Sequence, residues 1–308
     1  MAVLGGRLGP FRFNFNASRD GAGVYLGLGG AAWQRLHAGL AQRNRRRREQ
    51  QAVRSPEAPK GVSAAAAEKL KRIAGLGWYH TLDLGDGVRT DGAFDHTPHL
   101  AKYRLPADLS GKRVLDIGSF DGFWSFEFER RGAAEVIAWD APSLADLDFP
   151  PAARQAMTAE QLAIAPGKGF ALAIELLQSK VQRRVGSVYA ITPEEVGVFD
   201  MTHIGNVLVH LRDPAGALQR MARVTAGEAW IVEAYEPELG PETSVMRYMG
   251  GQQDCNWWRF SEQALRDMVA HAGFASVEEV ARFAIPFRGS NRNMHLLVLR
   301  ARSRGASH

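Results

Sequence analysis

Cysteine is almost missing from this chain of 308 residues, which contains Cys255 alone. One thiol excludes an internal disulfide and a metal cluster built on cysteines, and we expect no bound metal. Apolar runs are short as well, since none approaches the ~20 residues that a membrane-spanning helix needs. The start of the chain lacks the charged and then apolar layout of a secretory signal. These absences predict a cytoplasmic protein with no membrane partner.

Basic residues are in the minority outside the first part of the chain. Residues 1–60 contain eleven of the 38 Lys and Arg but only three of the 33 Asp and Glu. The rest of the chain therefore carries 27 basic and 30 acidic side chains, a balance of −3. A protein that grips a phosphate backbone usually has a basic face on its folded domain. The body lacks that excess as a whole, although a local basic patch is compatible with this average.

The leader, residues 1–62, is rich in glycine at first and then contains the arginine run Arg43–Arg48. Such a run can bind nucleic acid or an anionic surface, but a solvated, disordered extension has the same composition. Many arginines with few acids are also typical of organelle transit peptides, and a misassigned translation start would give a similar segment. We expect a basic, disordered leader and base no function on it.

The most informative segment is Arg113–Gly122, in which a short apolar run leads to Asp116. A turn bracketed by Gly118 and Gly122 follows, and the next residues, Phe123–Arg130, predict a helix. Strand, glycine turn and helix form the first unit of a doubly wound α/β domain, in which ligands lie at the carboxyl end of the strand. The segment therefore predicts a nucleoside-binding turn.

The identity of the nucleoside follows from the residues around this turn. Asp140 ends the next strand-like run and stands ~20 residues beyond the turn, where a ribose hydroxyl pair is usually held. A dinucleotide would require glycines where this chain has Phe120 and Phe123. The turn thus favours a ligand without a pyrophosphate, and the early carboxylate Asp116 favours one with a cationic group. S-adenosylmethionine (SAM) meets both conditions, and a tight turn without any ligand is the alternative.

Several segments resemble a known family. Asp116–Gly122 resembles motif I of class I SAM-dependent methyltransferases, and Asp140 falls at the ribose-binding acid of that superfamily. Gly205–Pro214, Trp78–Gly87 and Asn256–Trp258 are similar to segments of the tRNA wobble-uridine (carboxy)methyltransferase-like group. The resemblance is specific for the superfamily and suggestive for the group.

The resemblance covers roughly residues 65–301 and implies an α/β fold. This fold is a doubly wound, Rossmann-like, seven-stranded methyltransferase sheet with an N-terminal cap. Together with composition it divides the chain into a leader (1–62), a cap (63–110), a SAM-binding methyltransferase domain (111–301) and a tail (302–308).

Strand and helix signals alternate through the expected domain, as a doubly wound sheet requires. Residues 170–181 have the apolar spacing of an amphipathic helix, and Ser261 and Gly273 bound another. The strands after Asp140 are predicted at residues 187–191, 198–204, 229–234, 277–285 and 295–299.

The resemblance also implies where the cofactor is held. In the superfamily the loop after the third strand flanks the adenine, which points to Tyr189 and Ala190, although the usual acidic residue is absent there. Side chains at the end of the fourth strand face the transferred methyl group. The expected cofactor-binding residues are Asp116, Gly118, Ser119, Gly122, Asp140, Tyr189, Ala190 and Asn206.

Methyl transfer needs a general base only when the nucleophile is a neutral hydroxyl. His210 is the first candidate for this catalytic role and His203 is the second. A structural hydrogen bond to the following loop is the alternative for His210. Trp257 and Trp258, beside Arg259, are candidates for binding a flat or anionic substrate. Neighbouring side chains of a strand face opposite ways, so at least one of the two tryptophans should belong to the core.

Two departures separate the chain from the tRNA group. Val209 replaces the tyrosine of the group's motif, and no lysine accompanies Trp78 where those enzymes hold a carboxylated SAM. Arg292 alone matches their C-terminal arginine, and is a further substrate-binding candidate. We therefore predict ordinary SAM and methyl transfer.

Three functions follow from the sequence. The first is a methyltransferase for a small-molecule acceptor. It is favoured by the aromatic residues in the C-terminal part of the chain and by the lack of a basic excess in the body. The second is a tRNA-modifying methyltransferase, and the third is a non-catalytic domain that binds SAM or RNA. Phe120 and Phe123 disfavour an NAD-dependent oxidoreductase. The acceptor atom and the oligomeric state stay open.

Overall fold

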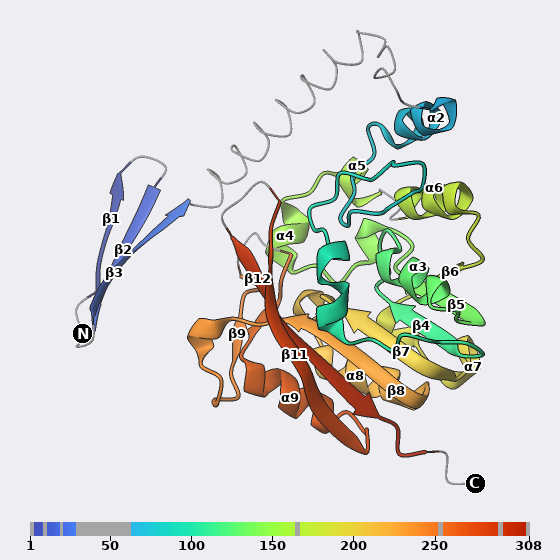
Figure 1. Cartoon of the computed structure of the whole chain (residues 1–308). Helices are drawn as coiled ribbons and strands as arrows, with labels where there is room; N and C mark the ends of the chain where they lie inside the picture. Colours follow the sequence, from blue (N-terminus) through green and yellow to red (C-terminus); the bar gives the residue numbers. More distant parts are fainter. Residues whose placement is uncertain are drawn as a thin grey trace. The chain divides into compact units, whose positions relative to one another are not determined.

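The computed structural model describes residues 3–8, 11–18, 21–28, 63–163, 167–251, 255–288 and 292–305. The chain divides into two compact units, Met1–Val62 and Ser63–His308 (Figure 1). In the first unit, three strands form an antiparallel sheet in the order β1-β2-β3, with bounds Val3–Leu8, Phe11–Ser18 and Gly21–Leu28. The sequence analysis predicts no strands in this leader. The arginine run Arg43–Arg48 lies outside the described residues.

The second unit is built on a seven-stranded sheet in the order β11-β12-β8-β7-β4-β5-β6. Its strands are β4 (Arg113–Ile117), β5 (Glu135–Asp140), β6 (Gln182–Val185), β7 (Phe199–Gly205), β8 (Thr225–Ala234), β11 (Ser276–Pro286) and β12 (Asn293–Arg302). Neighbours from β8 to β6 pair in parallel, whereas β12 pairs antiparallel with both β8 and β11. The predicted doubly wound, seven-stranded α/β fold is confirmed.

Strand β4 is the switch point of this sheet, since β5 lies on one side of it and β7 on the other. The connections leave β4 and β7 in opposite directions along the sheet, which opens a crevice at the carboxyl ends of these strands. The glycine turn at residues 118–122 follows β4 directly and therefore lies in this crevice.

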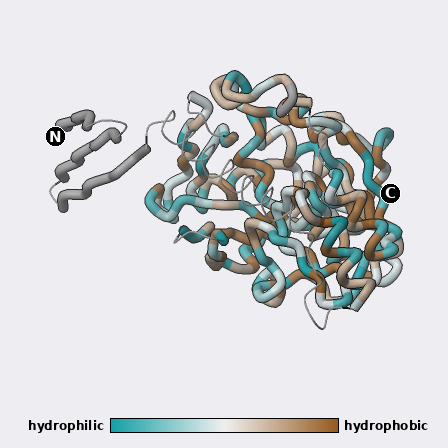
Figure 2. The backbone as a smooth tube through the Cα atoms, turned by 90° about the horizontal axis from the view of Figure 1, so that it is seen from above, coloured by the Kyte–Doolittle hydropathy of each residue, from teal (hydrophilic) through white to brown (hydrophobic). Residues whose placement is uncertain are grey.

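Helices cover both faces of the sheet: α3 and α6 lie on one side and α8 and α9 on the other (Figure 1). These helices span Phe123–Arg130, Lys168–Leu177, Pro214–Arg223 and Glu262–Ala270. The predicted caps of α8 and α9 are present, because Asp213 accepts from the Gly216 N–H at 2.8 Å and Ser261 from the Ala264 N–H at 3.1 Å. Apolar lengths of chain run through the interior of the unit (Figure 2).

Shorter elements complete the unit. They are α2 (Ala64–Ile73) and the 3₁₀ turn η1 (Thr97–Tyr103) in the cap, then α4 (Pro151–Gln155), α5 (Ala159–Leu162), α7 (Pro193–Val196), β9 (Met246–Tyr248) and β10 (Trp258–Phe260). No described helix is both long and apolar enough to cross a membrane. The division of the unit into cap, catalytic domain and tail stays a prediction.

The third strand was predicted in the wrong place. Residues 187–191 do not form a strand: β6 ends at Val185, and Val188–Ala190 form the 3₁₀ turn η3. The Ser187 hydroxyl accepts a hydrogen bond from the Tyr189 N–H at 3.2 Å and so turns the chain away from the sheet. The apolar residues of this segment pack in a turn instead of a strand.

Candidate functional site

Both glycines of the motif turn are required by close contacts. Gly118 has a φ of +73°, and a Cβ atom there would lie 2.4 Å from a methyl group of Val207. Gly122 has a φ of +88°, and its Cβ atom would lie 2.5 Å from the ring of Phe170. Only glycine adopts this backbone without strain and leaves room for these neighbours. The turn is thus held close to the loop after β7, across the switch point.

Asp116, next to the last residue of β4, is hydrogen-bonded inside the protein. Its side chain is buried, with the Ser125 hydroxyl donating to one oxygen at 2.5 Å and His203 Nδ1 lying 2.9 Å from the other. These bonds tie β4 to α3 and β7 next to the motif turn. The expectation that this carboxylate also faces a cationic ligand stays a prediction.

The His203 side chain is buried as well. It has an exposed fraction of 0% and packs against the rings of Trp124 and Phe128. A base must come within hydrogen-bond distance of the proton that it removes. Full burial and the bond to Asp116 favour a structural role for His203, but its Nε2 has no hydrogen-bond partner among the described residues, and the catalytic role stays a prediction.

Ser119 Oγ and Asn206 Oδ1, at the carboxyl edge, are among the buried polar atoms that have no hydrogen-bond partner within the described residues, and Nε2 of His203 is another. Ser119 lies in the motif turn, and Asn206 follows β7 with a φ of +54°, a conformation rare outside glycine. The Asn206 N–H donates to the Val232 carbonyl at 2.8 Å. Buried polar atoms are normally satisfied, so Ser119 Oγ and Asn206 Oδ1 are available to a bound ligand.

Asp140 stands at the end of β5, beside the motif turn. One carboxylate oxygen accepts from the Phe120 N–H at 2.9 Å and the other from the Ala141 N–H at 2.8 Å. Burial raises the pKa of this carboxyl above its ordinary value, against the opposing effect of these backbone donors and of Arg183. Each oxygen can accept more than one hydrogen bond, so the carboxylate could still receive a ribose hydroxyl pair.

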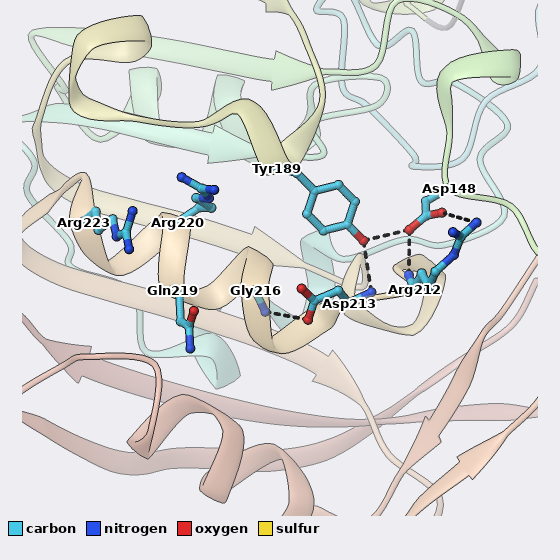
Figure 3. A pocket seen from close by; sticks show the side chains of 8 residues that line it. All are labelled: Asp148, Tyr189, Arg212, Asp213, Gly216, Gln219, Arg220 and Arg223. Carbon is cyan, nitrogen blue, oxygen red and sulfur yellow. Dashed lines mark hydrogen bonds and ion pairs between the residues drawn. The ribbon is translucent and has the colours of Figure 1, made fainter.

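Tyr189 and Ala190 lie in η3, next to a groove of about 420 Å³ (Figure 3). The Tyr189 hydroxyl donates to Asp148 at 2.7 Å and accepts from the Asp213 N–H at 3.1 Å. Asp148 also accepts from the Arg212 N–H at 2.7 Å. Sequence reasoning missed Asp148, because no motif or periodicity marks the segment between β5 and α4.

The groove is lined by arginines from the start and the end of α8. Arg212 lies beside Asp148 at one end, and Arg220 and Arg223 lie at the other (Figure 3). Within the described residues, neither Arg220 nor Arg223 takes part in an ion pair. The body therefore carries one local basic surface despite its acidic average.

His210 ends the 3₁₀ turn η4 (Leu208–His210) that follows β7. Its ring is half-buried, and its Nδ1 lies 3.1 Å from the Cys255 carbonyl oxygen. This is the hydrogen bond to a later loop that the sequence analysis names as the alternative. It also fixes the orientation of the ring at the carboxyl edge of the sheet.

The two tryptophans occupy different environments, with Trp257 directly before β10 and Trp258 as its first residue. Trp257 is buried, donates from Nε1 to the Asp148 carbonyl, and lies under the Arg212 guanidinium at 5.0 Å. Trp258 is half-buried and donates to the Arg212 carbonyl at 3.2 Å. Trp257 is therefore held inside the protein and Trp258 is the more accessible of the two, and their substrate-binding roles stay predictions.

The two candidate arginines lie in separate segments. Arg259 pairs with Glu236 just after β8, and Arg292 is an exposed residue directly before β12. Their substrate-binding roles stay predictions.

A contact between the cap and the motif turn was missed from the sequence. Asp121 is buried in the turn, and one of its oxygens accepts the N–H groups of both Tyr79 and His80 at 2.8 Å. The other oxygen pairs with His80 Nδ1, and the His80 ring stacks on Phe123 at 5.5 Å. We name this set of bonds the Asp121 clamp. The participants are 41 residues apart, so no local pattern reveals it.

Glu233, near the end of β8, was also missed. Its side chain is buried and accepts from the Leu208 N–H at 2.7 Å and from the Ala234 N–H at 2.9 Å. Burial raises the pKa of this carboxyl to about 7, and these backbone donors oppose the rise. In sequence, Glu233 is one acidic residue in an apolar strand, with no pattern to assign it a partner.

The fold and the turn define a nucleoside-binding α/β protein, and comparisons give its class. A family model described as a methyltransferase domain matches residues 93–279. The chain therefore belongs to this family and is a SAM-dependent methyltransferase. No curated protein matches the chain.

Solved structures with the same fold are distant in sequence. The N-terminal domain of EvdMO1, crystallised in the presence of SAH and D-fucose, has 16% identity and a TM-score of 0.54, covering 80% of this chain and 100% of that one. The YcgJ protein from Bacillus subtilis has 14% identity and a TM-score of 0.47, covering 68% and 98%. Neither the family nor the shared fold singles out the tRNA wobble-uridine group.

The residues at the carboxyl edge fit SAM. The unpartnered Ser119 Oγ and Asn206 Oδ1 offer hydrogen bonds, and Asp140 has acceptor capacity for the ribose. Within the described residues, no three His, Cys, Asp or Glu side chains are grouped so that they could hold a metal ion.

Proposed function

We propose that the enzyme transfers the methyl group of SAM to a small-molecule acceptor, with His210 as the general base. The observation that carries the assignment of His210 as the base is the bond between its Nδ1 and the Cys255 carbonyl. A carbonyl oxygen only accepts hydrogen bonds, so Nδ1 holds the proton. When the imidazole is neutral, its lone pair is then on Nε2, as a base requires.

The chain's own contribution to the reaction is mainly alignment. SAM supplies a methyl group on a sulfonium sulfur, which makes the methyl carbon strongly electrophilic. Asp140, Ser119 and Asn206 would orient the nucleoside, and alignment of the two reactants can contribute up to ~7–11 kcal/mol. Nε2 of His210 would take the proton from the acceptor hydroxyl, an effect of ~10²–10⁴-fold. The Asp121 clamp holds the cap over the turn and so helps to exclude water.

The proposed acceptor class is tested by supplying labelled SAM to the enzyme with a small-molecule extract and, separately, with bulk tRNA. We expect the label in the small-molecule fraction alone. His210→Gln should lower the rate by ~10²–10⁴-fold while leaving the affinity for SAH unchanged. Label in tRNA alone would contradict the acceptor class, and a fully active His210→Gln variant would contradict the base.

One observation favours a tRNA acceptor as a second candidate, namely the arginines that line the groove beside Tyr189. Phosphate contacts of this kind make binding depend on salt. If tRNA is the acceptor, the double variant Arg220→Ala/Arg223→Ala should reduce the salt dependence of tRNA binding by roughly 0.7–0.9 in slope per lost contact. An unchanged slope would remove this support.

A further inference from the structure

The turn after β7 carries two residues assigned above to the reaction. Asn206 presents its unpartnered Oδ1 at the start of the turn, and His210 ends it. Inside the turn, the His210 N–H donates to the Val207 carbonyl at 2.9 Å, and the Leu211 N–H donates to the Leu208 carbonyl at 3.2 Å. The position of this turn therefore sets the position of both groups.

The first N–H groups of a short helical turn have no partners within the turn itself. Here a carboxylate from the neighbouring strand satisfies them. Glu233 accepts from the Leu208 N–H at 2.7 Å, and the N–H groups of Val207 and Val209 lie close enough to stabilise its charge. The Ala234 N–H donates to its second oxygen. One side chain thus ties β8 to the whole turn after β7.

Burial of a carboxylate is costly unless it is fully hydrogen-bonded. Glu233 has an exposed fraction of 1%, and replacing a buried charge by a well-packed apolar residue is often neutral or stabilising. Tyr79 of the cap is a titratable group that interacts with it from another element, and the pKa of Tyr79 is raised by burial and then by the charges of Glu233 and Asp121. The presence of a buried carboxylate at this position is therefore explained by the backbone N–H groups that it binds.

We propose that Glu233 is a positioning residue of the methyltransferase: it acts through the turn after β7, holding Asn206 toward the cofactor and His210 toward the acceptor. The part that concerns His210 rests on the function proposed above, whereas the part that concerns Asn206 rests on cofactor binding alone. Glu233 itself contacts neither reactant. Protonation of Glu233 places an O–H beside N–H donors and loosens the turn.

The test is a titration of SAH, measured by calorimetry between pH 6 and pH 8.5. Glu233 with a pKa of about 7 is about one-tenth ionised at pH 6, so wild-type affinity should fall by up to about tenfold from the upper to the lower limit. Glu233→Gln should bind SAH more weakly at high pH and lose this dependence. The matched control is Glu228→Gln at the other end of β8, which should follow the wild-type curve. Asp140 can also titrate, so a pH dependence that persists unchanged in Glu233→Gln belongs to another group and overturns the proposal.

A second measurement covers the case in which Glu233→Gln does not fold. In the wild type, the amides of residues 207–209 and 234 should exchange faster at pH 6 than at pH 8, after correction for intrinsic rates. Equal protection at both values would overturn the proposal. His210→Gln separates this inference from the proposed function: if that variant still transfers methyl groups, the base assignment fails, while the SAH and exchange results for Glu233 stand.

Discussion

At the scale of single residues, the site is distinguished by which polar groups are already bonded inside the protein. Asp116 and His203 are paired with each other and buried, an arrangement that favours support of the turn over contact with the reactants. Ser119 and Asn206 have unused hydrogen-bonding atoms, and Asp140 has spare acceptor capacity. The sequence identified all of these residues as candidates. Only the structure shows which of them are bonded inside the protein and which have hydrogen-bonding capacity left for a ligand.

Replacing Asp140 with alanine tests the ribose contact. The variant loses one or more charge-assisted hydrogen bonds of ~1.5–3 kcal/mol each, so calorimetry should give a dissociation constant for SAM about 10- to 150-fold higher. The matched control is Asp200→Ala, which removes a carboxylate near the opposite end of β7 that accepts from the Arg113 N–H. It should leave the affinity unchanged, and equal affinities for wild type and Asp140→Ala would show that the ribose lies elsewhere.

Replacing His203 with alanine tests its assignment to structure. Loss of a fully buried ring that pairs with Asp116 should lower the free energy of unfolding by about 2–5 kcal/mol, because a cavity and an unpaired carboxylate remain. Chemical denaturation measures this, with the exposed His271→Ala as control. A variant of undiminished stability that no longer transfers methyl groups would support the catalytic assignment.

At the scale of elements, the crevice is closed by contacts between segments that are distant in the chain. The Asp121 clamp joins the cap to the motif turn, and Asp148 joins the segment after β5 to η3 and to the loop before α8. Alternation and capping signals predicted most strands and helices. They failed at residues 187–191, where a serine hydroxyl turns the chain after β6, because apolar spacing alone does not separate a strand from a turn that packs on the core.

Asp121→Ala should loosen the cap. Three hydrogen bonds to Tyr79 and His80 are lost, so hydrogen exchange at the amides of residues 79 and 80 should accelerate. SAM affinity should fall as well, since the clamp orders the turn that binds it. Asp95→Ala, which breaks the exposed pair with Arg89 in the same cap, is the matched control. Unchanged exchange in Asp121→Ala would show that the cap is held by its aromatic contacts instead.

At the scale of the whole molecule, charge and chemistry are carried by different parts of the chain. The first 60 residues hold the basic excess, and the carboxyl edge of the sheet in the second unit holds the cofactor residues. The family and the fold were predictable from one turn and the order of strands. The contacts of Asp121, Asp148 and Glu233 were not, because each joins residues that only the tertiary structure brings together.

Removal of residues 1–62 should leave SAM affinity unchanged, because every proposed cofactor contact lies in the second unit. Any affinity for tRNA that comes from the leader should disappear with it, together with its steep dependence on salt. Calorimetry and filter binding on the full chain and the truncated chain measure the two effects. A truncated chain that folds but no longer binds SAM would contradict this division of roles.

The central claim is that the turn after β4 binds SAM and not a dinucleotide, and calorimetric titration of the full chain with SAM and with NAD tests it most directly. Phe120 and Phe123 occupy positions where a dinucleotide needs glycine, while Asp140, Ser119 and Asn206 offer hydrogen bonds to a single nucleoside. We predict saturable binding of SAM and no binding of NAD. Tight binding of NAD with no heat from SAM would contradict the account.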